Sequence, residues 1–182
     1  MSDIDRWTKN NRTRLSGLMG LVFLVLSRPT PGTLLAGLLL IAAGESLRIW
    51  SSGYIHKNQA LTVTGPYSLS RNPLYLGSFI LGLGFLIGMG VVWMLIFFLL
   101  FFAVVYRFTV RWEEGKLSKK FPGEWESYSG RVPRFLPLGR MPVYTAGEFS
   151  WAQVLKHREL AHASIVLVVY LILWGKALFL GG

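Results

Sequence analysis

The residues best suited to chemistry lie in two polar stretches beside apolar segments. The first is the cassette at residues 65–77, GPYSLSRNPLYLG, which combines two prolines, two tyrosines, an arginine and an asparagine. Within it, Gly65-Pro66 predicts a turn, and Pro73 predicts the start of the helix that follows. The second contains Glu113 and Glu114, which follow Arg107 and Arg111 at the end of an apolar segment. An acidic pair can bind hydroxyls or an ammonium group, and arginines can orient an anionic group. These two stretches are therefore the candidate ligand site.

Other familiar reactive centres lack support in the sequence. Cysteine is absent, which rules out disulfides, thiolate metal sites and cysteine nucleophiles. No G-x-S-x-G occurs, so serine hydrolase chemistry is unsupported. His157 and His162 are spaced to lie about 140° apart on a helix, which predicts that they do not share one metal ion. We expect no metal, so any chemistry comes from an organic cofactor.

Three glycines at positions 82, 84 and 88 superficially suggest a dinucleotide-binding loop. They lie inside an apolar segment and follow no strand, so the dinucleotide fingerprint fails. The spacing of Gly84 and Gly88 instead favours close packing between membrane helices.

Glu45 and Arg48 form an ionisable pair inside the apolar segment 33–55. Their three-residue spacing puts both side chains on one face of a helix. Charges at membrane depth cost a few kcal/mol unless they are paired or hydrated. Two interpretations remain open: an ion pair that holds helices together, or a pair that borders a polar cavity opening inward.

The elements that must position these residues are apolar helices. The chain has 182 residues, of which 52% are hydrophobic and 15% charged, and a soluble domain of this kind would expose large apolar patches. Because a spanning helix needs about 20 apolar residues, we predict an all-α polytopic membrane helix bundle with about five transmembrane helices. Their expected ranges are 13–27, 33–55, 74–89, 91–110 and 163–180.

Basic residues predict the orientation of this bundle. With the N-terminus cytoplasmic and the C-terminus outside, all 19 Lys and Arg residues except Arg28 and Lys176 face the cytoplasm. This bias is typical of membrane proteins, so it explains the net charge of +10 without nucleic-acid binding. Residues 1–14 do not resemble a cleavable signal, and the small size favours a prokaryotic plasma membrane.

The cassette and the region 107–162 are expected on the same cytoplasmic side. Within that region, prolines interrupt residues 121–137, and Trp125 and Tyr128 are three residues apart. These aromatic residues are either anchors at the membrane interface or part of a segment that folds back to cap the inner mouth of the bundle.

The two motifs together resemble the isoprenylcysteine carboxyl methyltransferase family, within the membrane methyltransferases that include phospholipid N-methyltransferases. The resemblance rests on LTVTGPYSLSRNPLYLGSFILGLGF followed by EEGKLSKKFPGEWESYSGRVPRFLP. It covers residues 44–137 of a single integral membrane domain (1–182), and leaves 138–182 as a C-terminal extension whose last span has no assigned role.

The resemblance implies that S-adenosyl-L-methionine binds on the cytoplasmic side. The implied cofactor-binding residues are Gln59, Ala60, Leu61, Thr62, Tyr67, Arg71, Asn72, Pro73, Leu74, Tyr75, Glu113 and Glu114. Asn72 replaces the histidine of the eukaryotic pattern, so a histidine base at this position is excluded. Pro122 and Trp125 also depart from the family's glycine and tyrosine. A substrate-contacting arginine of the family falls near Thr109 in this sequence. Arg107 or Arg111 would therefore have to take the role of that arginine.

These features predict a methyltransferase that acts on a membrane lipid or lipidated acceptor through a carboxylate, thiol or amine, with S-adenosyl-L-homocysteine as the second product. Methyl transfer needs neither a metal nor a protein nucleophile, because the cofactor carries the reactivity. Two alternatives are an NADPH-dependent membrane reductase related to sterol reductases and a non-catalytic membrane scaffold. No feature of the sequence indicates an oligomer.

Overall fold

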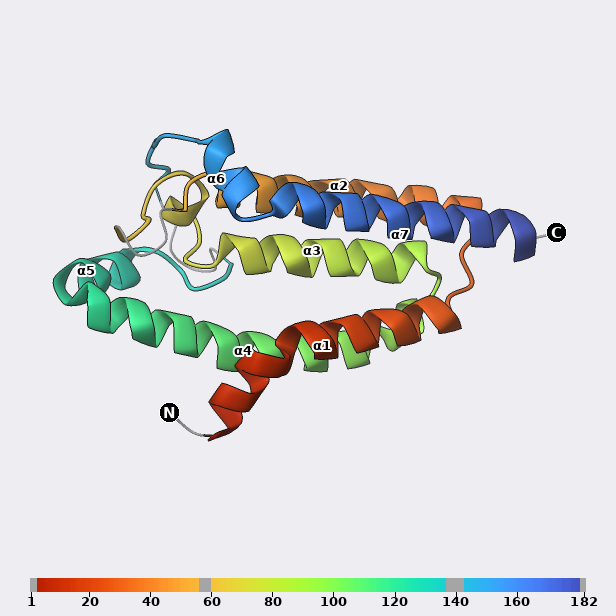
Figure 1. Ribbon diagram of the computed structural model, residues 1–182, viewed down its shortest axis with the longest axis horizontal. Coiled ribbons are helices and arrows are strands. Elements are labelled where there is room, and N and C mark those ends of the chain that lie inside the picture. The colour runs from red at the N-terminus through yellow and green to blue at the C-terminus, as the bar shows by residue number, and fades with distance from the viewer. Residues whose placement is uncertain (1–2, 56–59, 137–142, 181–182) are drawn as a thin grey trace. The chain divides into compact units, whose positions relative to one another are not determined.

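The computed structural model describes residues 3–55, 60–136 and 143–180, and every regular element in these ranges is a helix (Figure 1). The all-α prediction is confirmed. The long helices are α1 (Asp3–Leu26), α2 (Pro31–Ser52), α3 (Pro73–Gly88), α4 (Leu95–Lys120) and α7 (Glu159–Leu180). The short ones are η1 (Gly65–Ser68), η2 (Val92–Met94), α5 (Pro122–Arg131) and α6 (Trp151–Lys156).

Three segments are long and apolar enough to cross a membrane: Pro31–Ser52, Val92–Lys120 and Glu159–Phe179. The apolar parts of α1 and α3, Arg14–Leu26 and Pro73–Gly88, are shorter than this criterion requires. Large apolar side chains are exposed along the helices. Their exposure to water would be unfavourable, whereas lipid can cover them. The chain is therefore an integral membrane protein, whereas five spans and their orientation stay predictions.

Prolines set three helix starts. Pro31, Pro73 and Pro122 each stand at the first residue of a helix, where the missing N–H is harmless and the fixed φ fits the helix. The predicted start of α3 at Pro73 is confirmed. Other boundaries differ: α1 begins at Asp3 in polar sequence, and α4 continues ten residues beyond the predicted span end at residue 110, to Lys120. Apolar runs mark where a membrane can be, but helical hydrogen bonding continues through the polar residues beside them.

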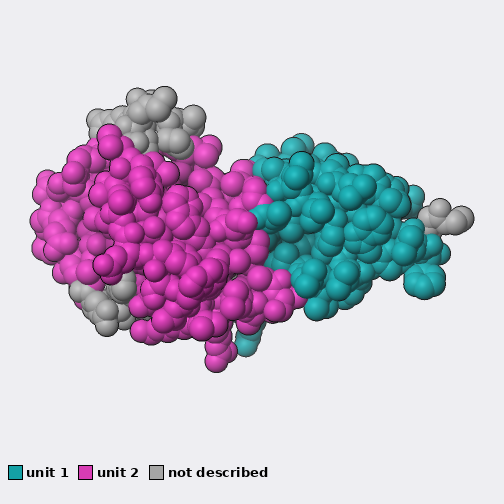
Figure 2. Space-filling view, turned by 90° about the horizontal axis from the view of Figure 1, so that it is seen from above, with its two compact units in different colours: residues 1–42, 81–113, 166–182 teal, residues 43–80, 114–165 magenta. Residues whose placement is uncertain are grey.

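The chain divides into two compact units, coloured separately in Figure 2. Unit 1 comprises Met1–Ala42, Leu81–Glu113 and Val166–Gly182. Within it, α2 and α3 approach so closely that a Cβ on Gly84 would stand 2.7 Å from Ile41 N and 2.9 Å from Gly37 O. The predicted packing role of Gly84 is thus confirmed. The Tyr170 hydroxyl of α7 donates to Leu34 O of α2 at 3.1 Å.

Unit 2 comprises Ala43–Ile80 and Glu114–Ile165, and contains the cassette, α5 and α6. An extended strap, residues 143–150, contacts the cassette: Gly65 N donates to Thr145 O at 2.8 Å, and Thr145 N donates to Ser68 Oγ at 3.0 Å. The C-terminal extension therefore packs directly against the first motif. The strap also stacks Tyr144 on Trp50, with ring centroids 6.4 Å apart.

Candidate functional site

The cassette begins with a turn that requires glycine. Gly65 has φ +58°, a left-handed conformation that L side chains rarely adopt. A Cβ at this position would also collide with the Tyr54 ring. Pro66 follows inside η1, which ends at Ser68, and α3 begins at Pro73. The predicted turn at Gly65-Pro66 is confirmed, and it leads the chain into α3.

Glu114 is the centre of a buried polar cluster in unit 2. Its side chain is 8% exposed and accepts from Arg134 through both Nε (2.9 Å) and Nη2 (2.8 Å) at the same oxygen, Oε2. The other oxygen, Oε1, lies 3.5 Å from Arg71 Nη1 and accepts from Asn72 Nδ2 at 3.2 Å. We call Arg71, Asn72, Glu114 and Arg134 the clamp. It joins the cassette to the second motif.

The second motif folds back onto the cassette at two further points. Tyr128 of α5 is 3% exposed and donates its hydroxyl to Tyr67 O at 2.7 Å. Arg71 N donates to Pro133 O at 2.9 Å, and the Arg71 guanidinium lies 5.6 Å from the Trp125 ring centroid. Tyr128 is thus a buried contact and not an interfacial anchor, and this segment folds back onto the cassette. The capping of the inner mouth of the bundle stays a prediction.

Burial raises the pKa of the Tyr128 phenol above its ordinary value near 10. The Arg71 charge lowers this pKa and the Glu114 charge raises it, both by smaller amounts. The neutral hydroxyl is therefore the form that the fold favours, in keeping with its hydrogen bond to a backbone carbonyl.

Several predicted cofactor residues already have protein partners. Asn72 Nδ2 donates to Glu114 Oε1 at 3.2 Å and to Arg134 O at 2.9 Å. Glu114 has both carboxylate oxygens engaged by the clamp. These two residues consequently hold the two motifs together. Sequence reasoning did not include Arg134, although a buried glutamate requires compensating charge and Arg134 directly follows Pro133.

The remaining predicted cofactor residues differ in exposure. Leu61 and Pro73 are buried, whereas Ala60 is exposed. Thr62, Tyr67, Leu74 and Tyr75 are half-buried. Gln59 lies outside the described residues.

Arg71 provides a test of whether these residues fit an anionic ligand group. Its Nε is buried and has no hydrogen-bond partner in the structure. An unpaired buried donor is costly, and a carboxylate placed near the start of α3 would satisfy it. The residues present therefore fit a ligand of the amino-acid type that the resemblance implies.

Unit 1 holds the other predicted residues, all on α4. Arg107 and Arg111 are exposed and Glu113 is half-buried. Thr109 is 1% exposed, and its Oγ1 is buried without a hydrogen-bond partner. Arg107 and Arg111 thus lie on the surface of the helix on either side of buried Thr109.

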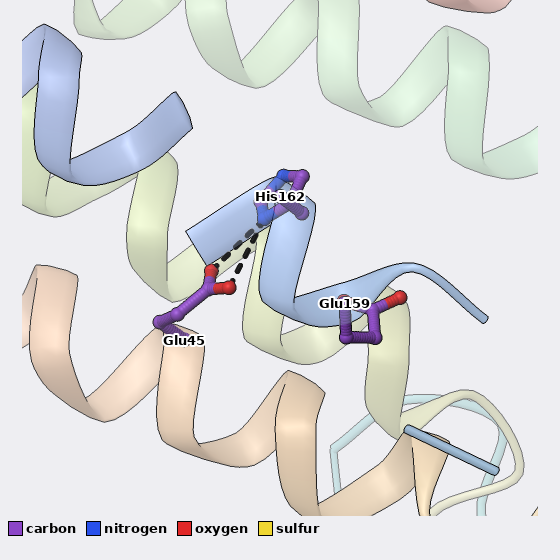
Figure 3. Close-up of side chains that lie close together, drawn as sticks. All are labelled: Glu45, Glu159 and His162. Carbon is purple, nitrogen blue, oxygen red and sulfur yellow. Dashed lines mark hydrogen bonds and ion pairs between the residues drawn. The ribbon is translucent and has the colours of Figure 1, made fainter. Parts of the chain in front are cut away.

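A second polar cluster in unit 2 lies where α2 and α7 meet (Figure 3). Arg48 Nη2 lies 2.8 Å from Glu159 Oε2, and Arg48 Nη1 donates to Ser78 Oγ at 2.5 Å. Glu45 Oε2 lies 3.8 Å from Arg48 Nε and 3.1 Å from His162 Nδ1. The interpretation of Glu45 and Arg48 as a pair that holds helices together is confirmed, while Glu159 and His162 were missed.

The long separation between these partners explains why they were missed. Glu45 and His162 are 117 residues apart, and no local spacing connects them. His157, which was predicted not to share a metal ion with His162, has its Nε2 3.3 Å from Ile55 O.

Comparison with known proteins gives one family and two curated relatives. Residues 32–124 match the phospholipid methyltransferase family. The cobalt-zinc-cadmium resistance protein CzcN of Cupriavidus metallidurans is 36% identical over 126 residues, which are 67% of this chain and 56% of the relative. The nickel-cobalt-cadmium resistance protein NccN of Alcaligenes xylosoxydans xylosoxydans is 36% identical over 108 residues, which are 57% of this chain and 49% of the relative.

The chain therefore spans about half the length of the curated relatives it matches. No solved structure matches it.

Proposed function

The chain belongs to the phospholipid methyltransferase family, and from this premise we propose that it transfers a methyl group from S-adenosyl-L-methionine to a lipidic acceptor in the membrane. The acceptor provides a carboxylate, thiol or amine. Its lone pair forms a bond to the methyl carbon while the carbon–sulfur bond breaks, and S-adenosyl-L-homocysteine leaves. A thiol or amine acceptor also gives up its proton to solvent.

The clamp is the observation that carries this proposal. Arg71 and Asn72 of the first motif contact Glu114, and Arg134 of the second motif contacts the same carboxylate. Methyl transfer depends mainly on placement, since alignment of the reacting groups can contribute about 7–11 kcal/mol. The bound cofactor supplies the reactive sulfonium. A rigid polar cluster that fixes both cofactor-binding motifs is what such placement requires.

Individual residues receive roles from their positions. Arg71 presents a buried Nε–H without a hydrogen-bond partner, beside the first turn of α3. We assign this donor and the amides of that turn to the carboxylate of the cofactor. Tyr67 and Tyr75, both half-buried, are assigned to the walls of the same site. Glu113 remains a predicted cofactor ligand, and Arg107 and Arg111 remain predicted to orient an anionic head group.

Ligand-dependent thermal stability of the purified protein in detergent tests the cofactor. S-adenosyl-L-homocysteine and S-adenosyl-L-methionine should raise the unfolding temperature, because a ligand that binds only the folded state stabilises it. NADPH is the matched comparison. A shift with NADPH alone would favour the reductase, and no shift with any of the three ligands would favour the scaffold.

Substitution of Arg71 locates the site. Arg71→Lys keeps the positive charge and removes the planar fork, so the thermal shift with S-adenosyl-L-homocysteine should decrease. Lys116→Ala, an exposed position on α4, is the control. Methyl transfer is then measured with labelled donor over membrane lipids and prenylated thiols, and an absence of labelled product from both classes would contradict the lipidic acceptor.

The names of the relatives suggest a biological setting. CzcN and NccN are named as resistance proteins for cobalt, zinc, cadmium and nickel. We extend the proposal to a membrane methylation that supports tolerance to such ions. A bacterial host that expresses the chain should grow at higher zinc or cobalt concentrations than one that expresses Arg71→Lys. Equal growth would contradict the setting and leave the enzymatic proposal to its own assay.

A further inference from the structure

A glutamate of α2 and a glutamate and a histidine of α7 form a compact donor set in unit 2. Glu159 is the first residue of α7 and His162 follows three positions later, so both lie on one helix face. Glu45 reaches them from α2 (Figure 3). Each residue offers one ligand atom, and the three atoms lie within 4.8 Å of one another. We propose that Glu45, Glu159 and His162 form a binding site for a divalent transition-metal ion.

The distances suit coordination after a small movement. His162 Nδ1 lies 3.1 Å from both oxygens of Glu45. Ligand atoms bound at about 2.0–2.2 Å around a tetrahedral zinc ion are separated from one another by about 3.3–3.6 Å. The Glu45–His162 edge is therefore already near its coordinated length. Coordination would require the Glu159 carboxylate to move inward from its contact with Arg48.

The burial of the two carboxylates favours the binding of a cation beside them. Glu45 is 8% and Glu159 is 7% exposed, and both belong to segments that are candidate membrane spans. Carboxylates in such places are costly unless they are paired or bind a cation. The His162 side chain is 38% exposed, so the donor set is not fully enclosed by protein.

The charge balance also leaves room for a cation. Arg48 is the basic residue that contacts both carboxylates, at 2.8 Å from Glu159 Oε2 and 3.8 Å from Glu45 Oε2. If the imidazole is neutral, the two carboxylates and the guanidinium together carry a net charge of −1. Arg48 Nε is buried without a hydrogen-bond partner. Arg48 thus acts as an outer partner that orients the ligating carboxylates.

The donor set identifies the class of ion. Imidazole nitrogen suits zinc, cobalt, nickel and copper, whereas magnesium and calcium prefer oxygen alone. Sulfur ligands from cysteine are not available in this chain. Zn²⁺ and Co²⁺ are the expected occupants, with solvent completing the coordination. Binding requires the deprotonated Nδ1, so it releases a proton when the imidazolium form is present.

The test titrates Co²⁺ and Zn²⁺ into the full chain, purified in detergent without a polyhistidine tag and stripped with chelator. We expect one ion per chain, with cobalt absorption in the visible range, and no comparable binding of Mg²⁺. His162→Gln should weaken Co²⁺ binding about tenfold or more, since even outer-shell changes cost about this much. His157→Gln is the matched control because it lies five residues away in the same region, outside the donor set.

Two outcomes would overturn the site. One is a wild-type chain that takes up no stoichiometric Co²⁺ or Zn²⁺, which would leave a closed ion-pair cluster. The other is a loss of affinity in His157→Gln equal to that in His162→Gln. If His162→Gln does not fold, X-ray absorption at the zinc edge of the wild-type complex decides: imidazole scattering supports the site, and an oxygen-only shell contradicts it.

Discussion

Arg134 presents two donors to one oxygen of Glu114: Nε at 2.9 Å and Nη2 at 2.8 Å from Oε2. Arg71 and Asn72 contact the opposite oxygen, so a single buried carboxylate connects three basic or amide side chains. The two arginines compensate the buried charge of Glu114, and the separation of Arg71 from Arg134 in the sequence makes the cluster a tertiary clamp.

Glu114→Gln should destabilise the protein by about 3 kcal/mol, because it leaves Arg71 and Arg134 without their shared carboxylate. This value is at the lower end of the destabilisation expected when one partner of a buried ion pair is removed. We choose the lower end because the Arg134 side chain is 51% exposed. Glu124→Gln, at an exposed position of α5, is the control and should change stability by less than about 0.5 kcal/mol. Denaturant unfolding in mixed micelles measures both, and equal effects would contradict a structural role for the clamp.

Gly65→Ala should destabilise the protein by about 1–3 kcal/mol, because alanine is strained at φ +58° and its Cβ would collide with the Tyr54 ring. Gly115→Ala is the matched control: it lies within α4, and its Cβ would meet no atom within 4 Å. That control should stabilise the helix by up to about 1 kcal/mol. Thermal unfolding in detergent should therefore shift in opposite directions for the two variants.

Tyr128 should make the stability fall at high pH. Burial raises its pKa in the folded state, so the unfolded chain releases this proton first, near pH 10. The contribution of the neutral phenol is present below that pH and is lost as pH rises above it. The difference in unfolding temperature between the wild type and Tyr128→Phe should be constant from pH 8 to about pH 9.5 and then decrease. A difference that grows with pH would contradict the buried neutral hydroxyl.

Local signals predicted some of these features and not others. Pro73 at a helix start, the turn at Gly65 and the packing surface at Gly84 follow from backbone chemistry that a few neighbouring residues determine. Contacts such as Glu45–His162 depend on tertiary packing, and no spacing in the sequence encodes them. The extent of α1 was missed for another reason: helix formation continues into polar residues that give no apolar signal.

The α2–α3 contact in unit 1 should be sensitive to added volume at one glycine. Gly84→Ala places a Cβ within 2.7 Å of Ile41 N and 2.9 Å of Gly37 O, and both are backbone atoms that cannot rotate away. The helices must separate and lose the close packing that small residues allow in membranes. Gly175→Ala is the control on α7, where a Cβ meets no atom within 4 Å.

We expect Gly84→Ala to unfold at a lower temperature than the wild type, with a cost of about 1–3 kcal/mol. Gly175→Ala should match the wild type or exceed it, since alanine is the better helix former. The measurement is thermal unfolding in one detergent for all three proteins. If Gly84→Ala is as stable as Gly175→Ala, the close approach of Gly84 to Gly37 and Ile41 does not hold these two helices together in the membrane protein.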